Sequence, residues 1–175
     1  MERLFESIAR FELEIGCGHG HWLTDFAQTK PGNTFIGIDI IGDRIDRANR
    51  KATRAGLENL HFLKAEALEF LEGLPVERSI ANVYILFPDP WPKKRHWKNR
   101  LMNRDFLEAL ATRCESGAKL YFRTDHEGYF DWTRELLPEL ESWRVDEDSA
   151  WPFERETVFQ SKAESYQSLV LAKRG

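Results

Sequence analysis

The chain has 175 residues, of which 42% are hydrophobic and 31% charged, so it is long and apolar enough to form one globular domain. No stretch approaches the roughly 20 apolar residues of a membrane span, and the N-terminus lacks a secretory signal pattern. Cys17 and Cys114 are too few for a disulfide framework. The formal net charge of −4 is a mild argument against nucleic-acid binding. We therefore expect a single cytoplasmic domain, residues 1–175, without membrane contact.

Apolar segments of strand type alternate with helical patterns along the chain. A glycine turn and a helix ending near Pro31 follow the first strand. The helix after the second strand carries Ile45, Ala48 and Ala52 at helical spacing, and Gly56 is a plausible stop. The predicted strands are 11–15, 34–39, 60–64, 80–87, 118–123, 143–145 and 165–172.

A later helix is expected to start at an Asn103 cap, to carry Phe106, Leu110 and Cys114, and to end just before Gly117. The five strand–helix units predict an α/β fold with a parallel sheet and right-handed crossovers. The last two strands have no helix between them, which predicts an antiparallel addition at one edge.

Ligands of such sheets bind beyond the carboxyl ends of the strands. Five features each follow a predicted strand and should therefore surround one crevice: the loop 16–20, Asp39, Glu66, Asp89 and Asp125.

The loop Glu14-Ile-Gly16-Cys-Gly18-His-Gly20 lies between a strand and a helix, where glycines allow a sharp turn and close approach of a ligand. A dinucleotide fingerprint would need glycine three residues after Gly18, but that residue is His21, which disfavours NAD. The E-x-G-x-G-x-G spacing resembles motif I of class I S-adenosylmethionine-dependent methyltransferases. The alternative is a glycine turn that only packs a strand against a helix.

This resemblance implies a Rossmann-like class I methyltransferase fold, with a mostly parallel seven-stranded sheet, an antiparallel edge strand and helices on both faces. It implies S-adenosylmethionine as cofactor and S-adenosylhomocysteine as product. Asp39 ends the second strand, where a carboxylate can accept hydrogen bonds from both ribose hydroxyls. Glu66 occupies the place where such enzymes often contact the adenine amino group. The cofactor residues implied are Glu14, Gly16, Gly18, Gly20, Asp39, Glu66 and Asp89.

Cys17, His19 and His21 form a C-x-H-x-H run that is compatible with zinc. No second cluster at the usual spacing completes four ligands, so we expect no metal. His61 and His96 are interpreted as packing or surface residues.

The fourth strand runs into Phe87-Pro-Asp89-Pro-Trp91-Pro, where prolines at alternate positions end the strand and stiffen the loop. Such a loop holds Asp89 over the crevice, although Asp89 as an ordinary turn residue remains the alternative. A basic cluster follows, comprising Lys93, Lys94, Arg95, Lys98, Arg100 and Arg104. Because nucleic acid responds to local charge, this cluster outweighs the negative total.

The segment Asp89-Pro-Trp-Pro-Lys-Lys-Arg-His resembles the signature of the bacterial tRNA (guanine-N7-)-methyltransferase family, and the similarity extends over 14–162. The resemblance implies transfer of a methyl group to a guanine in the tRNA variable loop, with tRNA as partner. It gives Asp89 the catalytic role as well as a cofactor contact, and makes Lys93 and Asp125 substrate-contacting. Arg95, in the same basic loop, would bind phosphates.

The family's C-terminal Thr-x-x-Glu substrate motif appears here as Thr157-Val-Phe-Gln160, and glutamine offers one acceptor oxygen where a carboxylate offers two. Many relatives also carry a longer, often basic segment before the first strand, whose contribution to RNA binding we expect to be missing here. Alternatives within enzymes are methylation of an exocyclic amino group, of a small molecule or of a protein. The alternative outside enzymes is an RNA-binding module of the same fold with reduced or lost activity.

Guanine N7 has an available lone pair and no proton, so its methylation needs alignment rather than a general base. Asp89 would stabilise the purine as it becomes cationic. Asp125, with Thr157 and Gln160, would accept the N1–H and N2–H₂ donors of guanine. Both a monomer and a homodimer are compatible with the sequence.

Overall fold

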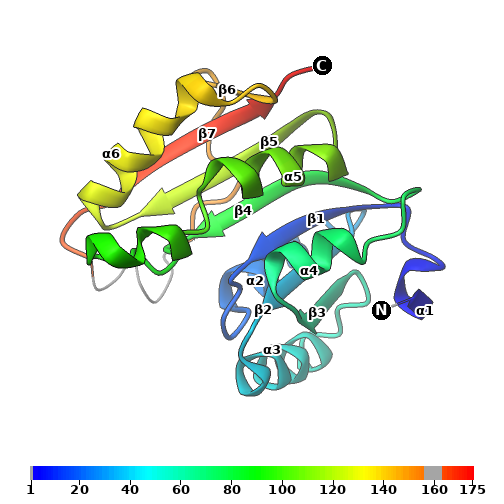
Figure 1. Cartoon of the computed structure of the whole chain (residues 1–175). Helices are drawn as coiled ribbons and strands as arrows, with labels where there is room; N and C mark the ends of the chain where they lie inside the picture. Colours follow the sequence, from blue (N-terminus) through cyan, green and yellow to red (C-terminus); the bar gives the residue numbers. More distant parts are fainter. Residues whose placement is uncertain (1, 156–162) are drawn as a thin grey trace.

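One sheet of seven strands organises the chain in the computed structural model, which describes residues 2–155 and 163–175 (Figure 1). The strands are β1 (Arg10–Ile15), β2 (Phe35–Asp39), β3 (Leu60–Lys64), β4 (Ser79–Leu86), β5 (Cys114–Thr124), β6 (Trp143–Val145) and β7 (Gln167–Lys173). The α-helices are α1 (Glu2–Phe5), α2 (His21–Thr29), α3 (Gly42–Arg54), α4 (Ala67–Glu72), α5 (Arg104–Arg113) and α6 (Glu127–Leu136). Two 3₁₀ helices are η1 (Lys94–Asn99) and η2 (Leu137–Glu139).

The strand order is β3-β2-β1-β4-β5-β7-β6. Strands β1 to β5 pair in parallel, and β7 is antiparallel to both β5 and β6. The arrows of β1, β4 and β5 in Figure 1 point one way and that of β7 points the other. The predicted fold class is confirmed, and the antiparallel strand lies between β5 and the edge strand β6. Because the order reverses between β1 and β4, a ligand crevice is expected beyond their carboxyl ends.

Helices cover both faces of the sheet. Apolar residues of α2 and α3 pack in one cluster with the side chains of Phe35, Tyr84 and Tyr121. Residues of α4, α5 and α6 pack in a second cluster with alternate residues of the same strands, such as Ile36 and Phe122. This alternation follows from the two-residue period of a strand, and it buries the central strands from both sides.

Most predicted boundaries agree with the structure to within one or two residues. The Asn103 cap is confirmed, because its side chain accepts a hydrogen bond from the Phe106 amide at 2.9 Å. The placement of Cys114 on the following helix is wrong. That helix ends at Arg113, and Cys114 has extended backbone and pairs with Ile80 as the first residue of β5. Gly117, predicted to follow the helix, lies within an irregular stretch of β5 at a φ of 77°.

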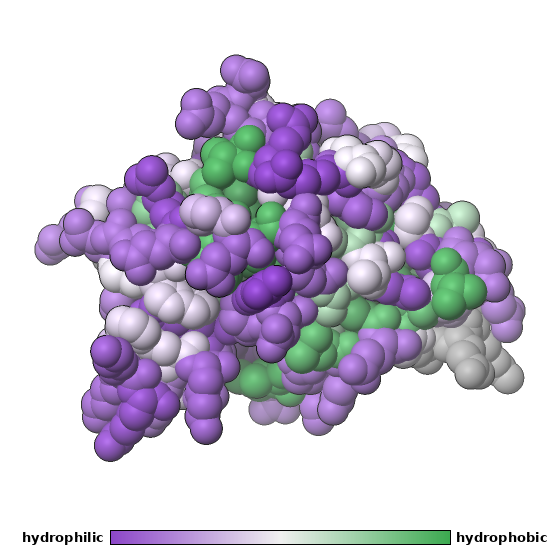
Figure 2. All heavy atoms as spheres, turned by 45° about the horizontal axis from the view of Figure 1, so that its top comes forward, coloured by the Kyte–Doolittle hydropathy of each residue, from purple (hydrophilic) through white to green (hydrophobic). Residues whose placement is uncertain are grey.

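The face drawn in Figure 2 is dominated by hydrophilic side chains, with apolar surface in smaller patches among them. Within the described residues, no helix is both long and apolar enough to cross a membrane. Cys17 and Cys114 are both free and buried.

Candidate active site

The glycine loop joins the end of β1 to the start of α2. Gly16, Gly18 and Gly20 all have positive φ, at 76°, 55° and 65°, a conformation that side chains with a Cβ rarely adopt. A Cβ added to Gly16 or Gly18 would meet no atom within 4 Å, and both residues line a cavity. The loop therefore leaves an open cradle where a ligand can lie against backbone.

Gly20 is placed differently. It does not line that cavity, and a Cβ there would collide with the ring of Phe62 and lie 2.8 Å from the Cβ of Ala48. Its lack of a side chain therefore lets α2 pack closely against β3 and α3.

The two glycines should respond differently to alanine. Gly20→Ala is expected to lower the free energy of unfolding by about 2–4 kcal/mol, because the cost of a positive φ at alanine adds to the cost of overpacking against Phe62 and Ala48. Gly18→Ala is expected to lose only about 1 kcal/mol but to weaken S-adenosylmethionine binding about tenfold or more, because its methyl group enters the cradle. Urea unfolding and calorimetric titration measure the two effects. A Gly20→Ala protein as stable as wild type would contradict this assignment.

Asp39, at the end of β2, is held in place by backbone donors. One carboxylate oxygen accepts from the Gly18 amide at 3.0 Å and the other from the Ile41 amide at 2.9 Å. The guanidinium of Arg44 on α3 lies 3.6 Å away. Each carboxylate oxygen keeps a further acceptor position, so Asp39 is fixed at the cavity wall and can still accept from a hydroxyl.

Glu66 lies beyond β3 and caps α4. Its Oε2 accepts from the amides of Leu68 and Glu69 at 2.8 and 3.1 Å. No described residue is hydrogen-bonded to its Oε1. Glu66 also lines the cavity, so it combines a structural cap with a free acceptor.

Glu14 is the buried acid of the loop, only 4% exposed, and it does not line the cavity itself. Its Oε2 has no hydrogen-bond partner among the described residues. Burial, and secondarily the charge of Asp39, raises the pKa of Glu14 to about 8. The structure therefore leaves a buried carboxyl oxygen without a described partner at the end of β1, two residues before the glycine cradle begins.

The cavity lies between the carboxyl ends of β1 and β4, where the strand order reverses, and has a volume of about 470 Å³. That size suits a small ligand or cofactor. Its walls are mainly apolar, with a few polar groups at the rim. The apolar residues are Ile15, Ile38, Ile40, Ile41, Ala65, Ala67, Leu86, Phe87, Pro88, Trp91 and Leu101. An open glycine cradle, a carboxylate for ribose hydroxyls and an apolar wall for a purine together fit S-adenosylmethionine.

The loop after β4 carries Asp89 to the cavity rim, where Asp89 is exposed. Phe87 and Trp91, on either side of it, have φ of 52° and 46°. A non-glycine residue in this region costs of order 1–3 kcal/mol and persists only where surrounding contacts hold it. Backbone strain on both sides of one carboxylate points to a loop shaped for function.

Asp125 follows β5 and is exposed, but it does not line this cavity. Its neighbour His126 caps α6, with Nδ1 accepting from the Tyr129 amide at 3.1 Å. The structure therefore gives His126 a structural task. Thr157 and Gln160 lie outside the described residues.

The basic cluster divides into two kinds of residue. Lys93, Lys94, Arg95 and Lys98 are exposed at or beside η1, a 3₁₀ helix that was not predicted from the sequence, and Arg104 is exposed at the start of α5. Arg100 is buried, at 1% exposure, so its grouping with the surface cations was wrong.

The C-x-H-x-H run does not bring its three side chains together, although the ring centres of His19 and His21 lie 6.2 Å apart. Cys17 is buried, whereas His19 and His21 are exposed. Burial raises the pKa of the Cys17 thiol, which disfavours a thiolate. Among the residues that the structure describes, no group of three or more His, Cys, Asp or Glu side chains could hold a metal ion.

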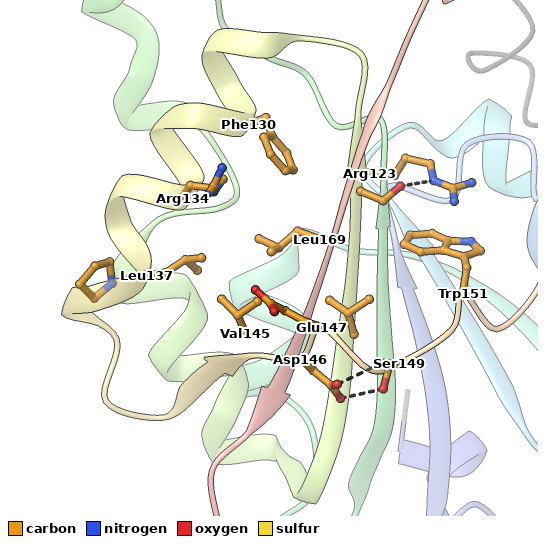
Figure 3. Close-up of a pocket in the computed structure, with 13 residues that line it drawn as sticks. Arg123, Phe130, Arg134, Leu137, Val145, Asp146, Glu147, Ser149, Trp151 and Leu169 are labelled. Atoms are coloured by element: carbon orange, nitrogen blue, oxygen red, sulfur yellow. Dashed lines mark hydrogen bonds between the residues drawn. The ribbon is translucent and has the colours of Figure 1, made fainter.

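A second cavity, of about 580 Å³, was not foreseen from the sequence (Figure 3). Figure 3 shows Phe130 and Arg134 projecting from α6 on one side, and Arg123 beside Trp151 on the other. Arg123 is buried and binds Ser168 at 2.9 Å. Its charge is paired with Glu154, so its polar groups already have protein partners.

A family model described as "Putative methyltransferase" (Methyltransf_4) matches residues 9–173. The tRNA (guanine-N(7)-)-methyltransferase of Thermus thermophilus is 34% identical over 146 residues, covering 83% of this chain and 47% of the relative. That of Magnetococcus marinus is 40% identical over 124 residues, covering 70% and 49%. The chain thus spans about half the length of these curated relatives.

Among solved structures, the 16S rRNA methyltransferase KamB superposes with a TM-score of 0.72 at 19% identity, covering 99% of this chain and 92% of that chain. The aminoglycoside resistance methyltransferase NpmB1 gives 0.65 at 17% identity, covering 98% and 91%. Likeness at these identities concerns the fold, which is that of class I methyltransferases. The family model and the curated relatives confirm the resemblance inferred from the sequence, and the chain belongs to the Methyltransf_4 methyltransferase family.

Proposed function

We propose that this chain, acting as one domain over 1–175, transfers a methyl group from S-adenosylmethionine to N7 of a guanine in the tRNA variable loop, conventional nucleotide 46. The observation that carries the proposal is the strained loop that holds Asp89 at the cavity rim and leads directly into the exposed cations Lys93 and Arg95. A methyl-donor pocket and a phosphate-binding surface are thereby adjacent. The proposed partner is tRNA, and the proposed location is the cytoplasm.

The bound donor supplies an electrophilic methyl carbon on a sulfonium. Gly16 and Gly18 would lie against the donor, Asp39 would accept from its ribose hydroxyls, and Glu66 has an oxygen free for its adenine amino group. The orphaned oxygen of Glu14 would accept a hydrogen bond once the donor is in place. These residues would orient the donor, and the apolar wall of the cavity would exclude water from its apolar side.

The guanine would be bound by residues that follow β4 and β5. N7 carries a lone pair and no proton, so the chain has only to align it. The carboxylate of Asp89 would stabilise the positive charge that the purine gains. Asp125 would accept the N1–H or N2–H₂ donors, together with Thr157 and Gln160.

Incubating the chain with labelled S-adenosylmethionine and unmodified tRNA tests the proposal, with nucleoside analysis of the product. We expect label in N7-methylguanosine. Label in an N-methylated amine would favour the exocyclic alternative, and label in neither, with donor binding intact by calorimetry, would favour an RNA-binding module without activity.

The basic loop makes a separate prediction. Lys93→Ala with Arg95→Ala should weaken tRNA binding and flatten its salt dependence by about one slope unit for each phosphate that the loop no longer neutralises. Filter binding over a range of salt concentrations measures the slope. Arg144→Ala is the matched control, because Arg144 is an exposed cation on the edge strand β6. Equal slopes in the double variant and wild type would count against the loop.

A further inference from the structure

The side chain of Arg100 is enclosed although it belongs to a basic run. Its guanidinium carbon lies 4.5 Å from the ring centre of Trp97, 4.7 Å from that of Tyr129 and 5.2 Å from that of Trp132. No carboxylate of a described residue forms an ion pair with it. Three aromatic faces therefore compensate a buried charge that is costly to desolvate.

The same guanidinium is hydrogen-bonded to two separate segments. Its Nε donates to the Pro90 carbonyl at 2.9 Å, and its Nη1 donates to the Gly128 carbonyl at 3.4 Å. Pro90 lies in the Asp89 loop, and Gly128 lies in the first turn of α6, three residues after Asp125. Arg100 thus joins the segments that follow β4 and β5.

The hydrogen bond from Arg100 to the Pro90 carbonyl supports a loop that has few hydrogen bonds of its own. The prolines at 88, 90 and 92 have no amide hydrogen, so the loop has few groups with which to fix itself. The Pro90 carbonyl belongs to the peptide that leads into Trp91, whose φ of 46° needs support from its surroundings. The planar guanidinium of arginine, fixed by stacking on aromatic rings, can hold this peptide in place. The ammonium of a lysine, on a flexible side chain, would hold it poorly.

We propose that Arg100 is a positioning residue that fixes the Asp89 loop against α6, and this proposal rests on the proposed function. The contact would align Asp89 and Asp125 on one guanine. Arg100 makes no contact with tRNA phosphate. Its loss should therefore affect the chemical step more than the binding of either substrate.

The test compares Arg100→Lys, which keeps the charge, with Arg100→Met, which keeps the bulk. Arg113→Lys is the matched control, because Arg113 also donates to backbone carbonyls, those of Leu74 and Pro75, near α4. Both Arg100 variants should lower kcat about 100-fold, the scale expected from a misplacement of about 1 Å. The KM for tRNA and the Kd for S-adenosylmethionine should change less than about threefold. The control should lose stability at similar kcat.

The rate of trypsin cleavage after residues 93–95 measures how firmly Arg100 holds the Asp89 loop, and it needs no methylation assay. We expect cleavage of the Arg100 variants to be about tenfold faster than that of wild type and of the Arg113→Lys control, because the released loop opens more often. A raised KM for tRNA with normal kcat, a kcat loss no larger than in the control, or equal cleavage rates would each overturn the proposal. If wild type methylates no tRNA, the proposed function fails, and the cleavage comparison alone then decides the anchoring.

Discussion

Asp89→Ala is expected to lower kcat for tRNA methylation about 1,000-fold while the Kd for S-adenosylmethionine rises less than about tenfold. The carboxylate stands at the exposed rim of the cavity, on the side of the basic loop. In the proposed reaction, this is where the purine would acquire positive charge. A preorganised charged or polar group that stabilises charge developing in the transition state raises the rate about 10²–10³-fold. Single-turnover methyl transfer separates this loss from any effect on product release.

Asp89→Asn is the companion variant, because it keeps the size of the side chain and its capacity to accept a hydrogen bond but removes the charge. It should recover little of the activity if charge is what matters. Near-normal turnover in Asp89→Ala would remove Asp89 from the mechanism, and full activity in Asp89→Asn would reduce its part to hydrogen bonding.

The sheet and the position of the crevice could be predicted from the sequence because both depend on local signals. Apolar runs, glycine stops and caps recur at short range, and the order of strand–helix units limits the topology. The same reasoning placed Asp39, Glu66 and Asp89 at strand ends, and the structure brings these three to one cavity. Cys114 was misplaced because an apolar residue at helical spacing also suits a buried strand.

What could not be predicted depends on contacts between residues far apart in the chain. Gly18 and Gly20 are alike in sequence, yet only Gly20 faces the ring of Phe62 across a tight contact. Arg100 looks like its charged neighbours until Tyr129 and Trp132 enclose it, and these lie on α6, which α5 and β5 separate from Arg100 in the chain. No local pattern reports such a partner.

Glu14→Gln is expected to stabilise the ligand-free protein at pH 8 and to weaken S-adenosylmethionine binding about tenfold, because glutamine offers one acceptor oxygen where the carboxyl group, with its orphaned Oε2, offers two. The pKa of Glu14 is about 8 in the folded chain against an ordinary 4.5, so between these values the folded state holds a proton that the unfolded state releases. The free energy of unfolding therefore falls as pH rises through this range, by at most about 1.4 kcal/mol per pH unit from this group. The glutamine variant lacks that decline.

Urea unfolding at pH 5.5 and pH 8 measures the difference. Variant and wild type should diverge as pH rises, with the variant ahead at pH 8 by up to roughly 4 kcal/mol. Glu12→Gln, the same change on the same strand, should instead destabilise, because the Glu12 carboxylate accepts hydrogen bonds from Tyr84 and Asn33. Parallel stability profiles for wild type and Glu14→Gln would mean that Glu14 is ionised in the ligand-free fold.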